Sequence, residues 1–193
     1  MCSSDLNGEF LAPLNSFKKH AKSLKKQQKS LARKLKGSKN WLKQKNKISK
    51  KHIQIADARK DYLHKCSSKI SKNHAIIILE DLKTGNMTRS AKGTAEKPGN
   101  RVKAKSGLNR AILDQGWFEF SRQLEYKQHF SGGKLVLVDP KYTSQKCPEC
   151  GHISKENRKC QSLFSCTKCQ YKNNADLTAA LNVLAAGHCR KVA

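Results

Sequence analysis

Two pairs of closely spaced cysteines constrain this chain more than any other feature of its sequence. The first pair is Cys147 and Cys150, the second is Cys166 and Cys169, and fifteen residues separate the two pairs. A C-x2-C turn presents two thiolates to one ion, and a second turn completes a tetrahedral set of four ligands. Spacings of about fifteen to twenty residues between such pairs are typical of structural zinc sites. The sequence therefore predicts a zinc ribbon, which we place at residues 143–172.

The other cysteines do not extend this pattern. A redox-active C-x2-C motif or a chance arrangement is the alternative for the two pairs, but both leave the fifteen-residue spacing unexplained. Cys160 and His152 lie within the predicted ribbon. Four thiolates already close a structural site, so we expect both residues to be bystanders. The remaining cysteines have no pairing pattern, and we expect ordinary small residues at Cys2, Cys66 and Cys189.

Positive charge is the second dominant feature. The 193 residues contain 40 Lys and Arg but only 14 Asp and Glu, which gives a formal net charge of +26 at pH 7. A charge of this size points to a polyanionic partner, and nucleic acid is the usual one. No apolar run reaches the roughly eighteen residues of a membrane span, and no secretory signal follows Met1. We therefore expect a cytoplasmic, nucleoid-associated protein and no membrane partner.

Half of the basic residues gather in one segment. Residues 18–72 hold 20 Lys and Arg and two acids. Apolar residues recur there at helical spacing and are interrupted at Gly37, which predicts two antiparallel helices with a narrow apolar seam. The seam consists of Ala21, Leu24, Leu31, Leu35, Trp41, Ile48, Ile55 and Tyr62. Mixed charges would serve solubility better, so we favour nucleic-acid contact over a merely solvated hairpin. The candidate contact residues are Lys25, Lys26, Lys29, Arg33 and Lys34.

Two short apolar runs predict strands. Residues 75–81 form a continuous β-branched run that ends in two acids, and residues 134–138 form a second run that is closed by Asp139. Runs without polar alternation are expected of central strands that are covered on both faces. The sequence therefore predicts two buried strands of one sheet.

Helices and a loop connect these strands. Residues 84–106 are rich in glycine and basic side chains and predict a mobile loop. Apolar spacing then predicts one helix from about Leu108 to Phe130. A last amphipathic helix follows the cysteines, and we expect it to end at Gly187. The order of elements predicts an α/β fold with an inserted module.

Two carboxylates lie where such a fold carries chemistry. Glu80 ends the first strand, and Asp176 opens the last helix. Each has an ordinary explanation, because acids are common at solvated strand ends and complement the macrodipole in the first turn of a helix. Together they also match part of a carboxylate cluster that holds two Mg²⁺ ions and cleaves a phosphodiester. Both explanations stay open on the residues alone.

Four motifs recur in a recognisable order. They are Ile78-Leu79-Glu80-Asp81-Leu82-Lys83, Gln115-Gly116-Trp117, Val138-Asp139-Pro140-Lys141-Tyr142-Thr143-Ser144-Gln145-Lys146-Cys147 and Asn174-Ala175-Asp176-Leu177-Thr178-Ala179-Ala180-Leu181-Asn182. The chain resembles the C-terminal half of TnpB/OrfB proteins, a transposase-like family of insertion sequences related to the RNA-guided nucleases of type V CRISPR systems. The resemblance covers nearly all of the chain.

This resemblance implies a fold, a division of the chain and roles for its residues. The fold is an incomplete RNase H-like domain of the RuvC type, with the basic hairpin and an inserted zinc ribbon. Residues 1–142 would hold the partial nuclease domain, 143–172 the ribbon and 173–193 the final helix. By motif, Glu80 matches the second catalytic acid of the family and Asp176 the third, while the two cysteine pairs match its zinc ligands. The family's partners are DNA and guide RNA.

The chain also departs from the family pattern. The first catalytic aspartate of the family lies upstream of a hairpin that resembles residues 4–10, and this chain starts at that hairpin. Asp5 aligns with a turn position and does not replace that aspartate. Gln170 stands where a glycine usually follows the last cysteine. We therefore expect a truncated copy that is unable to cleave alone, with Mg²⁺ bound only if the nuclease site is completed.

Three functions fit these observations. The chain is a DNA-binding relic of a transposable element, associated with recombination or transposition and without catalysis of its own. Alternatively, it is an RNA-guided DNA endonuclease that becomes active when an upstream half completes it. A basic, zinc-containing ribosomal type of protein fits the composition but leaves Glu80 and Asp176 in their motifs unexplained. Cleavage of DNA in Mg²⁺ separates the second function from the others.

Overall fold

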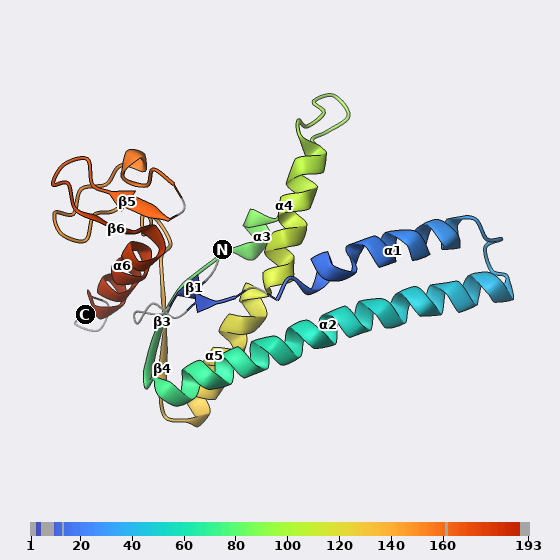
Figure 1. Ribbon diagram of the computed structural model, residues 1–193, viewed down its shortest axis with the longest axis horizontal. Coiled ribbons are helices and arrows are strands. Elements are labelled where there is room, and N and C mark those ends of the chain that lie inside the picture. Colours follow the sequence, from blue (N-terminus) through green and yellow to red (C-terminus); the bar gives the residue numbers. More distant parts are fainter. Residues whose placement is uncertain (1–2, 5–9, 13, 161, 190–193) are drawn as a thin grey trace. The chain divides into compact units, whose positions relative to one another are not determined.

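The computed structural model describes residues 3–4, 10–12, 14–160 and 162–189. These residues form short strands and longer helices (Figure 1). In chain order the elements are β1 Ser3–Ser4, β2 Phe10–Leu11, α1 Ser16–Ala32, α2 Lys39–Asn73, β3 Ile76–Glu80, α3 Thr84–Met87, α4 Val102–Gln115, α5 Trp117–Phe130, β4 Lys134–Val138, a 3-10 helix at Lys155–Asn157, β5 Leu163–Ser165, β6 Lys172–Asn174 and α6 Ala175–Cys189.

The chain divides into two compact units. The first unit comprises residues 1–13, 68–82 and 124–193, and the second comprises residues 14–67 and 83–123. The first unit therefore contains β3, β4, the cysteine-rich segment and α6. The second contains α1, most of α2, α3 and α4. The mixture of helices and strands agrees with the predicted α/β class.

The central element of the first unit is a parallel strand pair. β3 and β4 run side by side from Ile76 opposite Lys134 to Glu80 opposite Val138. The prediction that these strands are covered on both faces is wrong, because Ile76 is 44% exposed and only Ile77 and Val138 are buried. Among the described strands, each has a single neighbour in this sheet, and one sheet edge of each strand is left unpaired.

Helix α6 packs on this strand pair through a glycine. A Cβ atom at Gly187 would lie 2.5 Å from Cδ1 and 2.6 Å from Cγ2 of Ile78. The glycine thus lets the helix approach β3 closely, and it does not end the helix as predicted, since α6 continues to Cys189. A glycine near a helix end marks a stop only if its backbone leaves the helix, and here the packing against the strand determines its role.

The predicted basic hairpin is confirmed as two helices. α1 and α2 are separated by residues 33–38, with Gly37 at φ 85°. Leu24 and Ile55 of the predicted seam are buried, each 2% exposed, but Leu35 is 81% exposed because it lies past the end of α1 in the connection. The seam is therefore shorter than the apolar spacing predicts.

One buried acid joins three helices of the second unit. Asp114 of α4 accepts the backbone N–H of Phe17 at 2.9 and 3.1 Å, in the first turn of α1. It also forms an ion pair with Arg59 of α2, at 3.5 Å. A carboxylate at a helix N-terminus satisfies a free amide and complements the macrodipole. Asp114 therefore fixes where α1 starts.

The single helix predicted between Leu108 and Phe130 is wrong in two respects. α4 begins earlier, at Val102, so the predicted loop 84–106 includes the first turn of a helix and the short α3. The helix is also broken at Gly116, which adopts φ 70° before α5 begins. A Cβ atom there would lie 2.8 Å from Cδ1 of Leu63, so the junction needs a glycine for space as well as for conformation.

The first residues of the chain are described only in part. Ser3 and Ser4 pair antiparallel with Leu11 and Phe10, as the predicted hairpin at residues 4–10 requires. Asp5 and Cys2 lie outside the described residues, as does the side chain of Cys189.

Candidate metal centre and nucleic-acid interface

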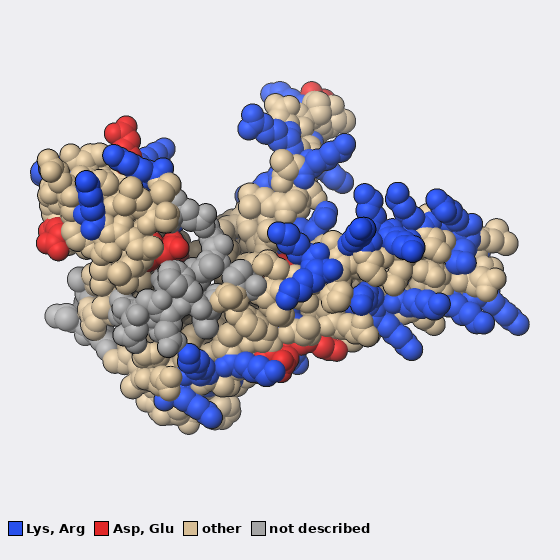
Figure 2. Space-filling view, in the orientation of Figure 1, with Lys and Arg blue, Asp and Glu red and all other residues tan. Residues whose placement is uncertain are grey.

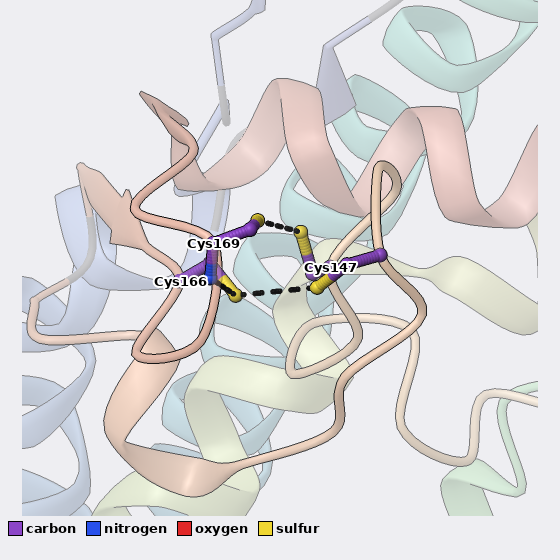
Figure 3. Close-up of side chains that lie close together, drawn as sticks. Cys147, Cys166 and Cys169 are labelled. Carbon is purple, nitrogen blue, oxygen red and sulfur yellow. Dashed lines mark hydrogen bonds between the residues drawn. The ribbon is translucent and has the colours of Figure 1, made fainter.

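The two cysteine pairs meet in space. The four sulfur atoms of Cys147, Cys150, Cys166 and Cys169 all lie within 4.8 Å of one another. The Sγ atoms of Cys147 and Cys169 are 3.6 Å apart, and those of Cys150 and Cys166 are also 3.6 Å apart (Figure 3). Among the described residues, no other His, Cys, Asp or Glu belongs to a group of this kind. This set of four sulfurs could hold one metal ion such as zinc.

Each pair is built on the same backbone turn. The N–H of Gly151 donates to the carbonyl of Cys147 at 3.0 Å, and the N–H of Gln170 donates to the carbonyl of Cys166 at 3.1 Å. Both donors have a left-handed backbone, with φ 71° at Gly151 and 62° at Gln170. The departure of Gln170 from the family pattern therefore leaves the turn itself intact. It places an L-residue in a conformation that favours glycine.

A small core supports the two turns. Phe164 and Ala175 are fully buried beside Cys147 and Cys166, and Tyr171 packs edge-on against the Phe164 ring at 6.2 Å between centroids. These rings hold the second turn against strands β5 and β6. The cysteines thus sit on a packed frame rather than on a free loop.

Asn157 is a fully buried polar residue that the sequence alone does not identify. Its Nδ2 donates to the carbonyl of Gln145 at 2.8 Å and to that of His152 at 3.2 Å, and its Oδ1 accepts the N–H of Thr167 at 3.0 Å. The side chain therefore links the first cysteine turn to the second. No spacing pattern identifies such a residue in a sequence, because most of its partners are backbone atoms.

The thiols of this cluster differ in acidity. The backbone N–H of Cys169 donates to Cys166 Sγ and lowers the pKa of Cys166 to about 6. The Tyr171 amide lowers the pKa of Cys169, but burial and the neighbouring thiols outweigh it and raise that pKa to about 12. Four crowded sulfurs cannot all ionise beside one another unless a cation neutralises them. The donor set therefore fits a thiolate-binding metal.

Glu80 lies at the end of β3, as predicted. Its Oε1 accepts the hydroxyl of Thr143 at 2.5 Å. The carbonyl of the buried Thr143 in turn accepts Nδ2 of Asn182, a residue of α6, at 2.8 Å. The strand end, the segment that leads into the cysteines and the last helix are thus connected through one threonine.

Asp176 lies in the first turn of α6 and has a charged partner. Its Oδ1 accepts from the guanidinium of Arg158 at 3.1 Å, and both side chains are between a quarter and a third exposed. Arg158 comes from the cysteine-rich segment, just after the 3-10 helix. The sequence alone does not identify this arginine, since it belongs to no motif and is one of many basic residues. Among the described residues, neither Glu80 nor Asp176 belongs to a converging group of three metal ligands.

Three of the candidate nucleic-acid residues, Lys25, Lys26 and Lys29, lie on α1, and the other two, Arg33 and Lys34, directly follow its C-terminal end. Four of them, Lys26, Lys29, Arg33 and Lys34, line one surface hollow of about 420 Å³ together with Ser30. Lys25 lies on the neighbouring face of the helix. Figure 2 shows that Lys and Arg side chains cover much of the visible surface of α1 and α2, where acids are few. The structure therefore brings together four of the five predicted residues.

No helix in the described part of the chain is long and apolar enough to cross a membrane.

Two protein families match the chain. Residues 2–91 match the family described as "Probable transposase", and residues 117–183 match the "Cas12f1-like, TNB domain" family. The second match includes all four clustered cysteines and Asp176, and the first includes the basic hairpin and Glu80.

Curated relatives and a solved structure agree with these matches. The chain is 56% identical over 182 residues to a protein of Escherichia coli (strain K12) named "Putative RNA-guided DNA endonuclease InsQ", covering 94% of this chain and 45% of that protein. It is 33% identical over 155 residues to a protein of Streptomyces pristinaespiralis named "Putative RNA-guided DNA endonuclease", covering 80% of this chain and 35% of that protein. A Cas12f1 chain, solved by cryo-electron microscopy with guide RNA and target DNA, shares the fold with a TM-score of 0.57 at 21% identity, over 91% of this chain and 43% of that one. The chain spans less than half the length of each.

Proposed function

We infer from these matches that the chain belongs to the TnpB/OrfB family of insertion-sequence proteins, and we propose that it is a nucleic-acid-binding protein of a transposable element. Its partners would be DNA and, within a complete family member, a guide RNA. The cell compartment that fits these partners is the cytoplasm, with the nucleoid as the place of action. The observation that carries the proposal is the clustering of Lys26, Lys29, Arg33 and Lys34 around one hollow at the C-terminal end of α1. Four positive charges around one surface hollow suit a phosphodiester backbone.

We also propose that the first unit is an RNase H-like domain of the RuvC type, with residues 143–172 as its inserted ribbon. A parallel strand pair that ends in Glu80, with α6 packed on β3, supports this assignment. Sheets of this kind carry their sites at the carboxyl ends of the strands. Asp176 and the Thr143 bridge belong to the same unit.

The four clustered cysteines would hold one structural Zn²⁺. Four thiolates close a tetrahedral site, so the ion would fix the two turns and take no part in chemistry. The packed frame of Phe164 and Tyr171 supports a structural role, because it packs against the turns that carry the sulfurs.

Glu80 and Asp176 would supply two carboxylates of a nuclease site. Mg²⁺, when bound to such a site, activates water and stabilises the leaving oxygen. Within this chain, Thr143 would orient the Glu80 carboxylate, and Arg158 would hold Asp176 and balance its charge in the absence of a cation. Two acids do not complete the site. We therefore expect the 193-residue polypeptide by itself to bind nucleic acid without cutting it.

The binding function is tested by salt dependence. Each phosphate contact adds about 0.9 to the slope of log affinity against log salt on duplex DNA. Replacing Lys25, Lys26, Lys29, Arg33 and Lys34 with Gln should lower this slope by about 3 to 4. The matched control replaces five other exposed lysines of the hairpin, at positions 39, 43, 47, 50 and 60, and changes the net charge equally. Equal loss of slope in both variants would show that only net charge matters, and an unchanged slope would refute the interface.

Cleavage tests the alternative function. The polypeptide is incubated with single- and double-stranded DNA in Mg²⁺ or Mn²⁺, beside a Glu80→Gln/Asp176→Asn variant. We expect no cleavage. Cleavage that the variant abolishes would overturn this expectation. A second polypeptide can supply the part of the Escherichia coli relative that this chain does not match. Cleavage that appears only when this polypeptide is added would support an RNA-guided endonuclease completed in trans.

A further inference from the structure

A second hollow on α1 differs in chemistry from the basic one. It is a groove of about 610 Å³ between α1 and α4, both of which belong to the second unit. Its wall on α1 consists of residues at one-turn spacing, and Arg110 faces them from α4. The lining residues are Phe17, Ala21, Lys22, Leu24, Lys25, Gln28 and Arg110. The groove is large enough for a nucleoside and is open to solvent at its rim.

The floor of this groove is apolar and its rim is basic. Leu24 is 2% exposed, and Phe17 and Ala21 are half-buried, so they form the floor. Lys22 and Lys25 are exposed beside it. The hollow around Lys26 and Arg33 has no comparable apolar residue in its lining, only basic side chains and one serine. The two faces of α1 therefore suit different parts of one polyanionic ligand.

Two residues of the groove, Phe17 and Arg110, are positioned by contacts with other groups of the second unit. The guanidinium carbon of Arg110 lies 5.6 Å from the centroid of the Phe17 ring, a cation–π contact that orients the arginine. Phe17 is itself fixed, because its backbone N–H donates to the buried Asp114. The charge of Asp114 is balanced by Arg59, so it does not repel an anion from the groove. Arg110 is itself exposed, so its guanidinium is accessible to a ligand.

We propose that this groove binds an unpaired base of single-stranded DNA or RNA, with Lys22 and Lys25 on the adjacent phosphates and Arg110 stacked on the base. This inference rests on the proposed nucleic-acid function and specifies the form of the ligand. Bases of a duplex are stacked on one another and have no face free for an apolar floor, whereas unpaired bases stack on aromatic side chains and arginine planes. Gln28 lies at the rim and offers a donor and an acceptor to the edge of the base.

The test compares oligonucleotides that differ only in their bases. The full chain is titrated with a labelled single-stranded DNA of twelve nucleotides, the same RNA, the matching duplex, and a DNA strand whose central nucleotides are abasic. We expect the base-bearing strands to bind about five- to tenfold more tightly than the abasic strand, since stacking is lost and the phosphates are kept. Comparison of the affinities for the single-stranded DNA and the RNA shows which of the two nucleic acids the groove prefers.

Two sets of variants assign this preference to the groove. Phe17→Leu and Arg110→Gln should lower the ratio of base-bearing to abasic affinity to about one and leave duplex binding within about twofold. Arg33→Gln, in the basic hollow at the end of α1 and outside this groove, should weaken binding of all four ligands and leave the ratio unchanged. Arg110 is exposed, so its variant tests the proposal even if Phe17→Leu unfolds the helix.

Specific results would overturn the proposal. Equal affinity for base-bearing and abasic strands would refute it, and so would a ratio that both groove variants leave unchanged. Displacement of the strand by poly-glutamate at equal charge would show that the site recognises negative charge alone. If the intact chain binds none of the four ligands, the proposed nucleic-acid function itself is wrong.

Discussion

Gln170 is the residue whose backbone conformation fits its side chain least. It adopts φ 62° at the position where the first cysteine turn has Gly151 at 71°. An L-residue pays about 1–2 kcal/mol in the left-handed region, while glycine loses about 0.5–1 kcal/mol through the entropy of the unfolded chain. Gln170→Gly should therefore raise the free energy of unfolding by about 0.5–1 kcal/mol. Urea denaturation of the parent protein and the variant measures this difference in the free energy of unfolding.

The reverse change at the equivalent position is the control for that prediction. Gly151→Gln introduces a side chain at a position where no atom lies within 4 Å of an added Cβ atom, so only the backbone strain should matter. We expect it to destabilise the protein by an amount similar to the gain from Gln170→Gly. A destabilising effect of Gln170→Gly would show that the glutamine side chain makes a favourable contact that outweighs the strain.

Glu119 gives the protein a pH dependence. Hydrogen bonds from Arg122 and then Gln123 lower its pKa from 4.5 to about 2. A lowered pKa means that the carboxylate stabilises the folded state above about pH 4.5, and that this contribution is lost as the pH falls towards 2. Because its side chain is one-third exposed, we expect less than about 1 kcal/mol. The stability difference between the parent and Glu119→Gln should shrink between pH 5 and pH 2.

A second glutamate of the same helix serves as the reference for this measurement. Glu125 is exposed, and Glu125→Gln changes the net charge of α5 by the same amount. If both variants show the same pH dependence in urea denaturation, the effect comes from net charge and not from the Arg122 contact.

At the scale of elements, the approach of α6 to β3 depends on one glycine. Gly187→Ala would place a methyl group 2.5–2.9 Å from three carbon atoms of Ile78. Alanine favours a helix by about 1 kcal/mol, but overpacking costs about 1–3 kcal/mol, so we expect a net loss of up to about 2 kcal/mol. Gly107→Ala in α4, where nothing lies within 4 Å, should instead stabilise by about 0.5–1 kcal/mol.

A double-mutant cycle identifies the contact responsible. Ile78→Ala removes all three of the crowded carbon atoms, so adding Gly187→Ala to it should cost much less than in the parent protein. If the two substitutions are additive, α6 has shifted for another reason and the close approach to Ile78 does not set its position.

The elements differ in how far sequence alone predicts them. Strands β3 and β4 and helices α1 and α2 were predictable because their apolar spacing and the break at Gly37 are local signals. The break at Gly116 was not, since both sides continue a helical pattern and the reason for the glycine is the distant Leu63. The exposure of Ile76 also escaped prediction, because a continuous apolar run does not state how many neighbouring strands or helices will cover it.

The residues of the candidate site also differ in how far the sequence alone predicts them. The clustering of the four cysteines was predictable because metal ligation imposes spacing along the chain. The catalytic roles of Glu80 and Asp176 rest on family motifs and stay predictions. Arg158 and Asn157 were not, because their partners lie elsewhere in the fold and the residue types themselves are common on surfaces. What tertiary structure adds is therefore the set of residues that orient the ligands.

For the whole molecule, metal removal is the decisive perturbation. The cysteine segment has a small core, so we expect loss of the metal to unfold residues 146–174 and leave the α1–α2 hairpin protected. Acid should have the same effect, because thiolates must be deprotonated to bind the ion. Hydrogen exchange followed by mass spectrometry, with and without a chelator, measures both segments. We expect metal analysis to find one bound Zn²⁺ per chain before the chelator is added.

Matched cysteine variants control this experiment. Cys166→Ser/Cys169→Ser should abolish metal binding, whereas Cys160→Ser, an exposed cysteine outside the cluster, should retain one ion per chain. A folded, metal-free parent protein would contradict the assignment, and so would zinc retained in the double variant.

The parallel pairing of β3 with β4 also determines the order in which the protein can fold during synthesis. Ile76 pairs with Lys134, which the ribosome adds 58 residues later. At about 5–20 residues per second, this interval lasts roughly 3 to 12 s. The basic helices precede it and can form early, but the apolar strand β3 must wait with both edges open. Newly made chains are therefore most exposed to aggregation before Val138 emerges, and a chaperone or bound nucleic acid that covers them in this interval would raise the yield of folded protein.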